Sequence, residues 1–246
     1  SGHFYGFPQA VTDLKNAIDF IDNGSLSVIL MGHSMGAYAV CAVGAHTDKR
    51  IDGIVAYAPF FSSDEAIIAE AKGSMPKCGK LLCGLILPMQ RILFGRNCNP
   101  TAAAGLSCAR VPTLILQGDR DREVTPDGCA LYAHRRELSH FPVTFRLIQK
   151  EESNGHMTVI RKKGSQTVNE DTIRQVDVFL DTVTMSRAHR EKKQNITEEC
   201  NMKNSALVVI DLQNDITKHY KEIIEKVNEA INWAVKKGLH IVYIQH

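Results

Sequence analysis

A serine stands between two glycines in the stretch GHSMG (32–36), directly after the apolar run Leu26–Met31. A serine hydroxyl becomes a nucleophile when a base removes its proton, and it must project clear of the backbone to reach a carbonyl carbon. A tight turn from a strand into a helix provides that projection, and glycines relieve the crowding beside the serine. The helix dipole and the backbone N–H of Met35 would then stabilise an oxyanion. The stretch predicts a nucleophilic Ser34, and an ordinary surface serine in a glycine-flanked turn is the alternative.

An acid and a base follow this serine in the chain. The segment PTLILQGDRDREVTP (112–126) offers a strand, a glycine and then two carboxylates, Asp119 and Asp121. The segment RLIQKEESNGHMTV (146–159) places His156 in a loop after the next strand. In a Ser-His-Asp mechanism the histidine takes the proton of the serine, and the acid fixes the tautomer of the histidine. These residue types in this order predict acyl transfer.

Three other histidines compete with His156 as the base. His33 adjoins the serine, but it is tied to the backbone of the turn, and we expect its side chain to point away. His134 falls on a predicted helix face and His140 precedes a strand, so we expect both to be solvated. The carboxylate that does not hold the histidine is expected to cap the turn at 118–121.

Alternating strands and helices must position these residues. A buried run without polar alternation predicts a strand at 26–31, and further strands are predicted at 51–56, 113–117 and 143–148. Helical spacing and capping residues predict helices at 10–21, at 37–45, from Thr125-Pro126 onward, and from 170 to about 184. This alternation predicts an α/β fold with a mostly parallel sheet that is covered by helices on both faces.

Two segments interrupt the alternation. Residues 62–108 are too many for a connecting loop and predict a helical cap that lies over the serine. Within this cap, the apolar segment 81–94 could pack onto the sheet or line an acyl pocket, and we favour packing for most of its side chains. The lysines at 72, 77 and 80 are expected to be solvated. The second interruption, 186–204, is strongly charged and indicates a linker or a frayed helix end.

The composition limits which classes of partner we expect for this protein. The chain has 246 residues and a formal net charge of +2, which gives no indication of a nucleic-acid partner. Its seven cysteines lack the spacing of a zinc site, so we expect reduced thiols and neither a metal nor a cofactor. No signal peptide is visible, and no apolar run approaches the roughly 20 residues that a membrane span needs. We therefore expect a cytoplasmic protein without a membrane partner, and the oligomeric state stays open.

Three motifs together resemble the α/β-hydrolase superfamily, in its serine esterase and serine aminopeptidase-like branch. They are GHSMG at 32–36, G-x-x-D at 118–121 with Val124 and Pro126 behind it, and the Gly-His pair at 155–156. The segment SGHFYGFPQAVTDLKNAIDF (1–20) also resembles the part of the family that precedes the serine strand. The resemblance covers about residues 1–185.

This resemblance implies a catalytic trio of Ser34, Asp121 and His156, with the Met35 N–H as an oxyanion donor. It favours Asp121 over Asp119, because Asp121 fits the position of the family acid. The family also has strands upstream of residue 1, one of which brings a second oxyanion N–H. The chain therefore resembles a fragment that lacks the N-terminal third of such a domain.

A second resemblance begins at residue 205. The run SALVVIDLQNDI (205–216), with the helix and strand that follow, resembles the opening of isochorismatase-like cysteine hydrolases. Asp211 matches the aspartate of that family, whose lysine and cysteine would lie beyond His246. A strand followed by a polar turn is the alternative. The expected organisation is an α/β-hydrolase domain at 1–185 with its cap at 62–108, a linker at 186–204 and a partial isochorismatase-like domain at 205–246.

The expected function is that of a serine hydrolase. It would cleave small carboxylic esters, thioesters or amides through an acyl-enzyme, and an apolar acyl or aromatic ester is the preferred substrate. Two alternatives stay open: a hydrolase-like scaffold that binds a ligand without turnover, and an aminopeptidase-type amide hydrolase.

Overall fold

A parallel β-sheet forms the centre of the computed structural model, which describes residues 6–21, 27–74, 78–162, 167–194, 205–210, 232 and 240–244. Across these residues the strand order is β4-β3-β2-β1-β5-β6, and every neighbouring pair is parallel. The strands are β1 (Ser27–His33), β2 (Gly53–Tyr57), β3 (Thr113–Gly118), β4 (Val143–Ile148), β5 (Ser205–Ile210) and β6 (His240–Ile244). This confirms the predicted α/β class.

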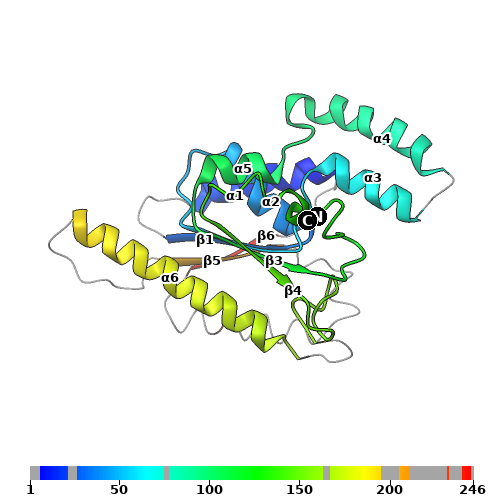
Figure 1. Cartoon of the computed structure of the whole chain (residues 1–246). Coiled ribbons are helices and arrows are strands. Elements are labelled where there is room, and N and C mark those ends of the chain that lie inside the picture. The colour runs from blue at the N-terminus through cyan, green and yellow to red at the C-terminus, as the bar shows by residue number, and fades with distance from the viewer. Residues whose placement is uncertain are drawn as a thin grey trace.

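Helices cover both faces of the sheet (Figure 1). On one face lie α1 (Phe7–Ile21), α2 (Met35–Ala42) and α5 (Ala102–Ala109), and on the other lies α6 (Glu170–Gln194). The buried side chains accordingly form two clusters. Ile54 and Ala56 of β2 point into the first cluster, while Val55 and Tyr57 point into the second. This is the alternation that a strand buried on both faces requires.

Small residues bring α2 and α5 into close contact. A Cβ atom on Gly105 would lie 2.1 Å from the carbonyl oxygen of Cys41, so only glycine fits at that position. Behind α2, the 3₁₀ helix η1 (Val43–Ala45) makes a similar approach, because a Cβ on Gly44 would lie 2.4 Å from the carbonyl oxygen of Gly105. The small residues near the C-terminal end of α2 and in η1 therefore let α5 pack closely against this part of the fold.

The helix predicted from Thr125-Pro126 does not form. Turns follow Thr125, and then a short 3₁₀ helix, η3 (Leu131–His134). The backbone here pairs with the segment after β2: Ala130 forms an antiparallel bridge with Phe60, and the Leu131 N–H donates to the Pro59 carbonyl oxygen at 2.8 Å. A tertiary pairing of backbone groups thus replaces the helix that the N-cap pattern favoured.

Residues 62–108, which were expected to form a helical cap, contain an outer pair of helices and then α5. Helices α3 (Ser63–Ser74) and α4 (Gly79–Phe94) pack on each other, with α4 outermost in Figure 1, and a 3₁₀ turn η2 (Gly95–Asn97) follows. The packed face of α4 is narrow: Gly79 lies against Ala71, and Gln90 accepts a hydrogen bond from the Ser63 hydroxyl at 2.9 Å. In contrast, α5 belongs to the body of the fold.

Five of the nine large apolar side chains in segment 81–94 are exposed, and the other four, Leu82, Ile86, Leu87 and Phe94, are half-buried. Large side chains on its outer face are exposed: Leu81, Leu85, Met89, Ile92 and Leu93. The expectation that most of segment 81–94 is packing is therefore wrong. These side chains are exposed because α3 contacts only one narrow side of α4 and leaves the other sides of the helix uncovered. Lys72 and Lys80 are exposed as expected, and Lys77 lies outside the described residues.

The C-terminal strands join the same sheet. β5 pairs with β1 from Ser27↔Ser205 to Leu30↔Val208, and β6 continues beyond β5. Helix α6 runs past the predicted end at Thr184 to Gln194, so the first part of the charged segment is helical. Asp211, most of the helix expected after it and residues 195–204 lie outside the described residues, and the division into domains stays a prediction.

Three further observations concern the part of the chain that the structure describes. No helix in it is long and apolar enough to cross a membrane. Its six cysteines are all free: Cys41, Cys78, Cys83, Cys98, Cys108 and Cys129. It holds no group of three or more His, Cys, Asp or Glu side chains arranged for a metal ion.

Candidate active site

Ser34 occupies a sharp turn between β1 and α2. Its backbone has φ 54° and ψ −114°, a left-handed conformation that costs a non-glycine residue on the order of 1–3 kcal/mol. Two hydrogen bonds hold it: the Ser34 N–H donates to Tyr57 O at 2.9 Å, and Ser34 O accepts from the Tyr38 N–H at 2.9 Å. A Cβ on Gly32 would lie 2.4 Å from the carbonyl carbon and oxygen of Gly36. The first glycine of the motif is therefore a steric requirement of this turn.

Met35 begins α2 immediately after the serine. The first N–H groups of a helix have no partner within the helix, and the dipole adds a partial positive charge at that end. The backbone N–H of Met35 is thus available beside Ser34, which is the placement that an oxyanion donor needs.

Asp121 is buried, and both of its carboxylate oxygens have hydrogen-bond partners. Its Oδ1 accepts from the backbone N–H groups of Glu123 at 3.0 Å and Val124 at 2.9 Å. Its Oδ2 accepts from Gln117 Nε2 at 3.2 Å and lies 2.8 Å from His156 Nδ1. One oxygen therefore orders the loop while the other faces the histidine.

Asp119 takes no part in this arrangement. Its Oδ1 is buried without a hydrogen-bond partner among the described residues, and its backbone N–H donates to Ile148 O at 3.0 Å. The expectation that the second carboxylate caps the turn at 118–121 is wrong. Asp121 can order the loop and contact His156 at once because a carboxylate has two acceptor oxygens.

His156 is buried and faces two carboxylates. Besides Asp121 at Nδ1, Glu123 Oε2 lies 3.6 Å from Nε2, on a side chain that is 68% exposed. Burial disfavours the imidazolium, but the hydrogen bond and charge of Asp121, with the charge of Glu123, outweigh burial and raise the pKa of His156. The Asp121 contact places the Nδ1 proton and leaves Nε2 as the basic nitrogen.

His33 does not point away from the site. Its Nε2 lies 3.1 Å from the backbone oxygen of His156, and the two rings are 4.6 Å apart between centroids at 50°. Burial, and then the nearby charge of His156, lower the pKa of His33 to about 4. The prediction for this residue is therefore wrong: the last residue of β1 reaches the loop that carries His156.

The other two histidines lie apart from the site. His134 is half-buried, stacks on Phe61 with centroids 3.6 Å apart, and its Nδ1 lies 2.8 Å from Glu137 Oε1. It is packed rather than solvated, because it sits on η3 instead of an exposed helix face. His140 is exposed, as expected.

Two neighbours of the candidate site, Gln117 and Glu123, were not predicted from the sequence. Gln117 is completely buried at the end of an apolar strand, where its amide donates to Asp121, and a polar residue in such a strand was the available signal. Glu123 had no such signal, because it follows Asp121 in a charged run whose side-chain directions only the folded loop sets.

The carboxyl edge of the sheet brings the site together. Ser34 follows β1, Asp121 follows β3 and His156 follows β4, and the ends of parallel strands meet at one edge. The hydroxyl of Ser34 has no hydrogen bond to a described residue. His33, the residue before it, contacts His156. Catalytic hydrogen bonds are often longer without substrate, so the arrangement is compatible with proton transfer from Ser34 to His156.

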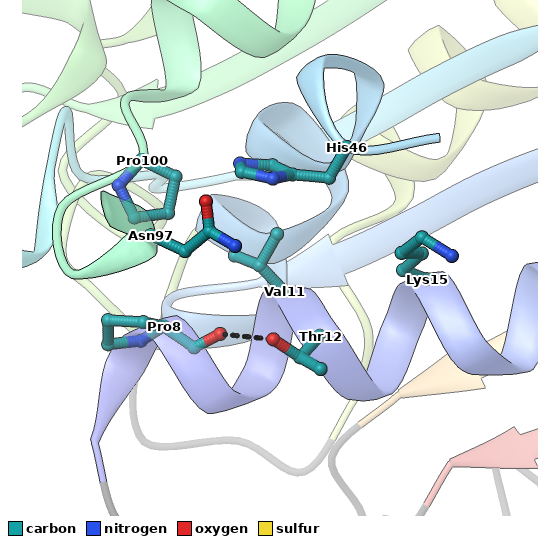
Figure 2. Close-up of a pocket in the computed structure, with 7 residues that line it drawn as sticks. All are labelled: Pro8, Val11, Thr12, Lys15, His46, Asn97 and Pro100. Carbon is teal, nitrogen blue, oxygen red and sulfur yellow. Dashed lines mark hydrogen bonds between the residues drawn. The ribbon is translucent and has the colours of Figure 1, made fainter. Parts of the chain in front are cut away.

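A pocket of about 150 Å³ lies elsewhere, between α1 and the segments around η1 and η2 (Figure 2). Its lining is formed by Pro8, Val11, Thr12, Lys15, His46, Asn97 and Pro100. The Thr12 hydroxyl there donates to the backbone oxygen of Pro8 in its own helix. No member of the trio lines this pocket, so it is not the candidate active site.

A family comparison matches the N-terminal part of the chain. The family described as "Serine aminopeptidase, S33" matches residues 1–98, which include Ser34 and Met35 and leave out Asp121 and His156. This match and the parallel α/β sheet support the α/β-hydrolase superfamily. A comparison with curated proteins found no match.

Several solved structures are similar at low identity. An esterase from Pyrococcus furiosus is 20% identical, with 65% of this chain and 59% of that chain covered and a TM-score of 0.44. An acylaminoacyl peptidase from Pyrococcus horikoshii is 11% identical, with 61% and 23% covered and a TM-score of 0.39. A monoacylglycerol lipase from Paleococcus ferrophilus is 16% identical, with 73% and 77% covered and a TM-score of 0.42. The chain thus spans little more than half of the esterase and a quarter of the peptidase.

Proposed function

We propose that this chain is a serine hydrolase that cleaves carboxylic esters, thioesters or amides through an acyl-enzyme. The observation that carries the proposal is the buried contact of 2.8 Å between His156 and Asp121, at the same sheet edge as the strained Ser34 turn. A buried carboxylate at Nδ1 fixes the tautomer whose Nε2 can accept a proton from a serine.

In the first half of the reaction, the Ser34 oxygen attacks the carbonyl carbon while His156 Nε2 takes the hydroxyl proton. The Met35 N–H stabilises the negative oxygen of the tetrahedral intermediate. The intermediate collapses to an ester of Ser34, and the His156 imidazolium returns its proton to the departing alcohol, thiol or amine. In the second half, water replaces the leaving group by the same steps and releases the acid and free Ser34.

An activated-serine probe tests this proposal. A fluorophosphonate should label the wild type on Ser34, and Ser34→Ala should remove the label. Ser139→Ala is the matched control, because Ser139 is exposed and lies outside the site, and it should label like the wild type. A wild type that stays unlabelled would favour the alternative of a binding scaffold without turnover.

An amide-cleaving aminopeptidase is a second candidate for the same site. The family match supports it, and so does Glu123, whose exposed carboxylate near His156 Nε2 could pair with the ammonium of an aminoacyl substrate. A chain-length series of p-nitrophenyl esters, run beside aminoacyl p-nitroanilides, separates the two. Faster cleavage of the anilides, with rates on the esters indifferent to acyl length, would favour the aminopeptidase. The exposed apolar face of α4 gives no support for an acyl pocket, so the ester preference rests on this series.

Asp211 belongs to a separate proposal. If residues 205–246 begin an isochorismatase-like hydrolase, Asp211 would serve a second site together with a lysine and a cysteine of that domain.

A further inference from the structure

The contact between His33 and His156 joins two parts of the proposed active site that the sheet keeps apart. His33 is the last residue of β1, and His156 lies in the loop after β4, with β2 and β3 between these strands. The hydrogen bond from the His33 ring reaches the backbone of a residue 123 positions away in the chain. Because His33 immediately precedes Ser34, this bond is a short mechanical link between the nucleophile and its base.

Other contacts join the His156 loop to the end of β3 and to the loop that follows it. The Arg120 N–H donates to Asn154 O at 2.9 Å, and Asp121 contacts the His156 ring from the same side. A Cβ on Gly118 would lie 2.3 Å from Asn154 O, so β3 and this loop also pack closely. These contacts fix His156 relative to Asp121. They do not reach β1, which leads into Ser34. The distance between His156 and Ser34 therefore depends on the contact that His33 makes.

We propose that His33 is a positioning residue of this hydrolase: its imidazole donates from Nε2 to the backbone oxygen of His156, packs at a tilt against the His156 ring, and so holds the base beside Ser34. A carbonyl oxygen only accepts, so Nε2 must carry the proton of His33. This inference rests on the proposed function and adds a role that the Ser-His-Asp mechanism does not require.

The absence of charge on His33 matters for this role. An imidazolium forms on His156 during acyl transfer, and a second positive ring 4.6 Å away would oppose it. Burial keeps His33 neutral at neutral pH. Three titratable side chains among the described residues face His156: Asp121, Glu123 and His33. Of these, His33 holds His156 in place without adding a charge beside it.

Two substitutions separate the hydrogen bond from the bulk of the ring. His33→Gln keeps an N–H donor at a similar reach, whereas His33→Leu removes it. With a fluorophosphonate probe and the full chain, we expect His33→Leu to lower the labelling rate of Ser34 about 10- to 100-fold, since a misplacement near 1 Å has effects of that size. We expect His33→Gln to recover the rate to within about fivefold of the wild type. The matched controls are His134→Leu and His134→Gln, at a half-buried, stacked histidine outside the site, and both should label like the wild type.

The pH profile distinguishes positioning from proton transfer. A positioning role lowers the plateau rate of His33→Leu and leaves the midpoint of the labelling profile, which reports His156, unmoved. A shifted midpoint, a His33→Gln variant as slow as His33→Leu, or full labelling of His33→Leu would each overturn the proposal. If the wild type is not labelled at all, the proposed function fails. Amide exchange in residues 149–158 then decides the link by itself: faster exchange in His33→Leu but not in His33→Gln supports it, and unchanged exchange in both refutes it.

Discussion

At the scale of single residues, the two neighbouring carboxylates of 119–121 have different environments. Asp121 is paired with His156 and with backbone N–H groups, whereas Asp119 has a buried oxygen without a partner among the described residues. Asp121→Asn replaces the acceptor at His156 Nδ1 by an amide that can hold the wrong tautomer. We expect it to slow Ser34 labelling about 10³- to 10⁴-fold.

The neighbouring substitution Asp119→Asn is its control and should stay within about threefold of the wild type. Equal losses in both variants would mean that the contact at His156 Nδ1 has no special part in activating the serine. The comparison uses initial labelling rates at matched protein concentration.

The pH dependence of labelling follows from the two carboxylates around His156. Only neutral His156 can act as the base, so the rate should rise with pH through a midpoint above the ordinary histidine pKa of 6.5, in line with the raised pKa of His156. Glu123→Gln removes one of the negative charges that favour the imidazolium. The midpoint should then move to lower pH, and the rate at about pH 6 should increase. A midpoint that stays in place would show that the charge of Glu123 does not reach His156.

At the scale of elements, the turn from β1 into α2 depends on the absence of a side chain at Gly32. Gly32→Ala would place a methyl group 2.4 Å from the Gly36 backbone, and the turn would have to open. We expect a loss of unfolding free energy above about 3 kcal/mol together with loss of labelling. Gly84→Ala is the control, because nothing lies within 4 Å of its Cβ position in α4.

That control should be neutral or should stabilise the protein by up to about 1 kcal/mol, since alanine favours a helix over glycine. Chemical denaturation measures both variants. A Gly32→Ala variant as stable as the wild type would contradict the steric account of the turn.

At the scale of the whole molecule, the sequence predicted the strands, helices and motifs that depend on neighbouring residues in the chain. The strands β1 to β4, the helix after Ser34 and the order of the trio all depend on local pattern and motif spacing, and the sheet places the trio at one edge. What escaped prediction depends on distant partners. The segment after Thr125 pairs with Phe60 instead of forming a helix, and His33 turns toward a residue 123 positions away. The exposed face of α4 could not be told from a packed one by composition alone, because α3 decides which side is covered.

The covalent intermediate tests the central claim most directly. The full chain is mixed with p-nitrophenyl acetate, quenched in acid within seconds, digested and mapped by mass spectrometry. The account predicts one acetyl group on Ser34 in the wild type and none in His156→Ala, because the serine cannot attack without its base. Acetylation of another side chain with Ser34 unmodified, or acetyl-Ser34 at the same level in His156→Ala, would contradict it.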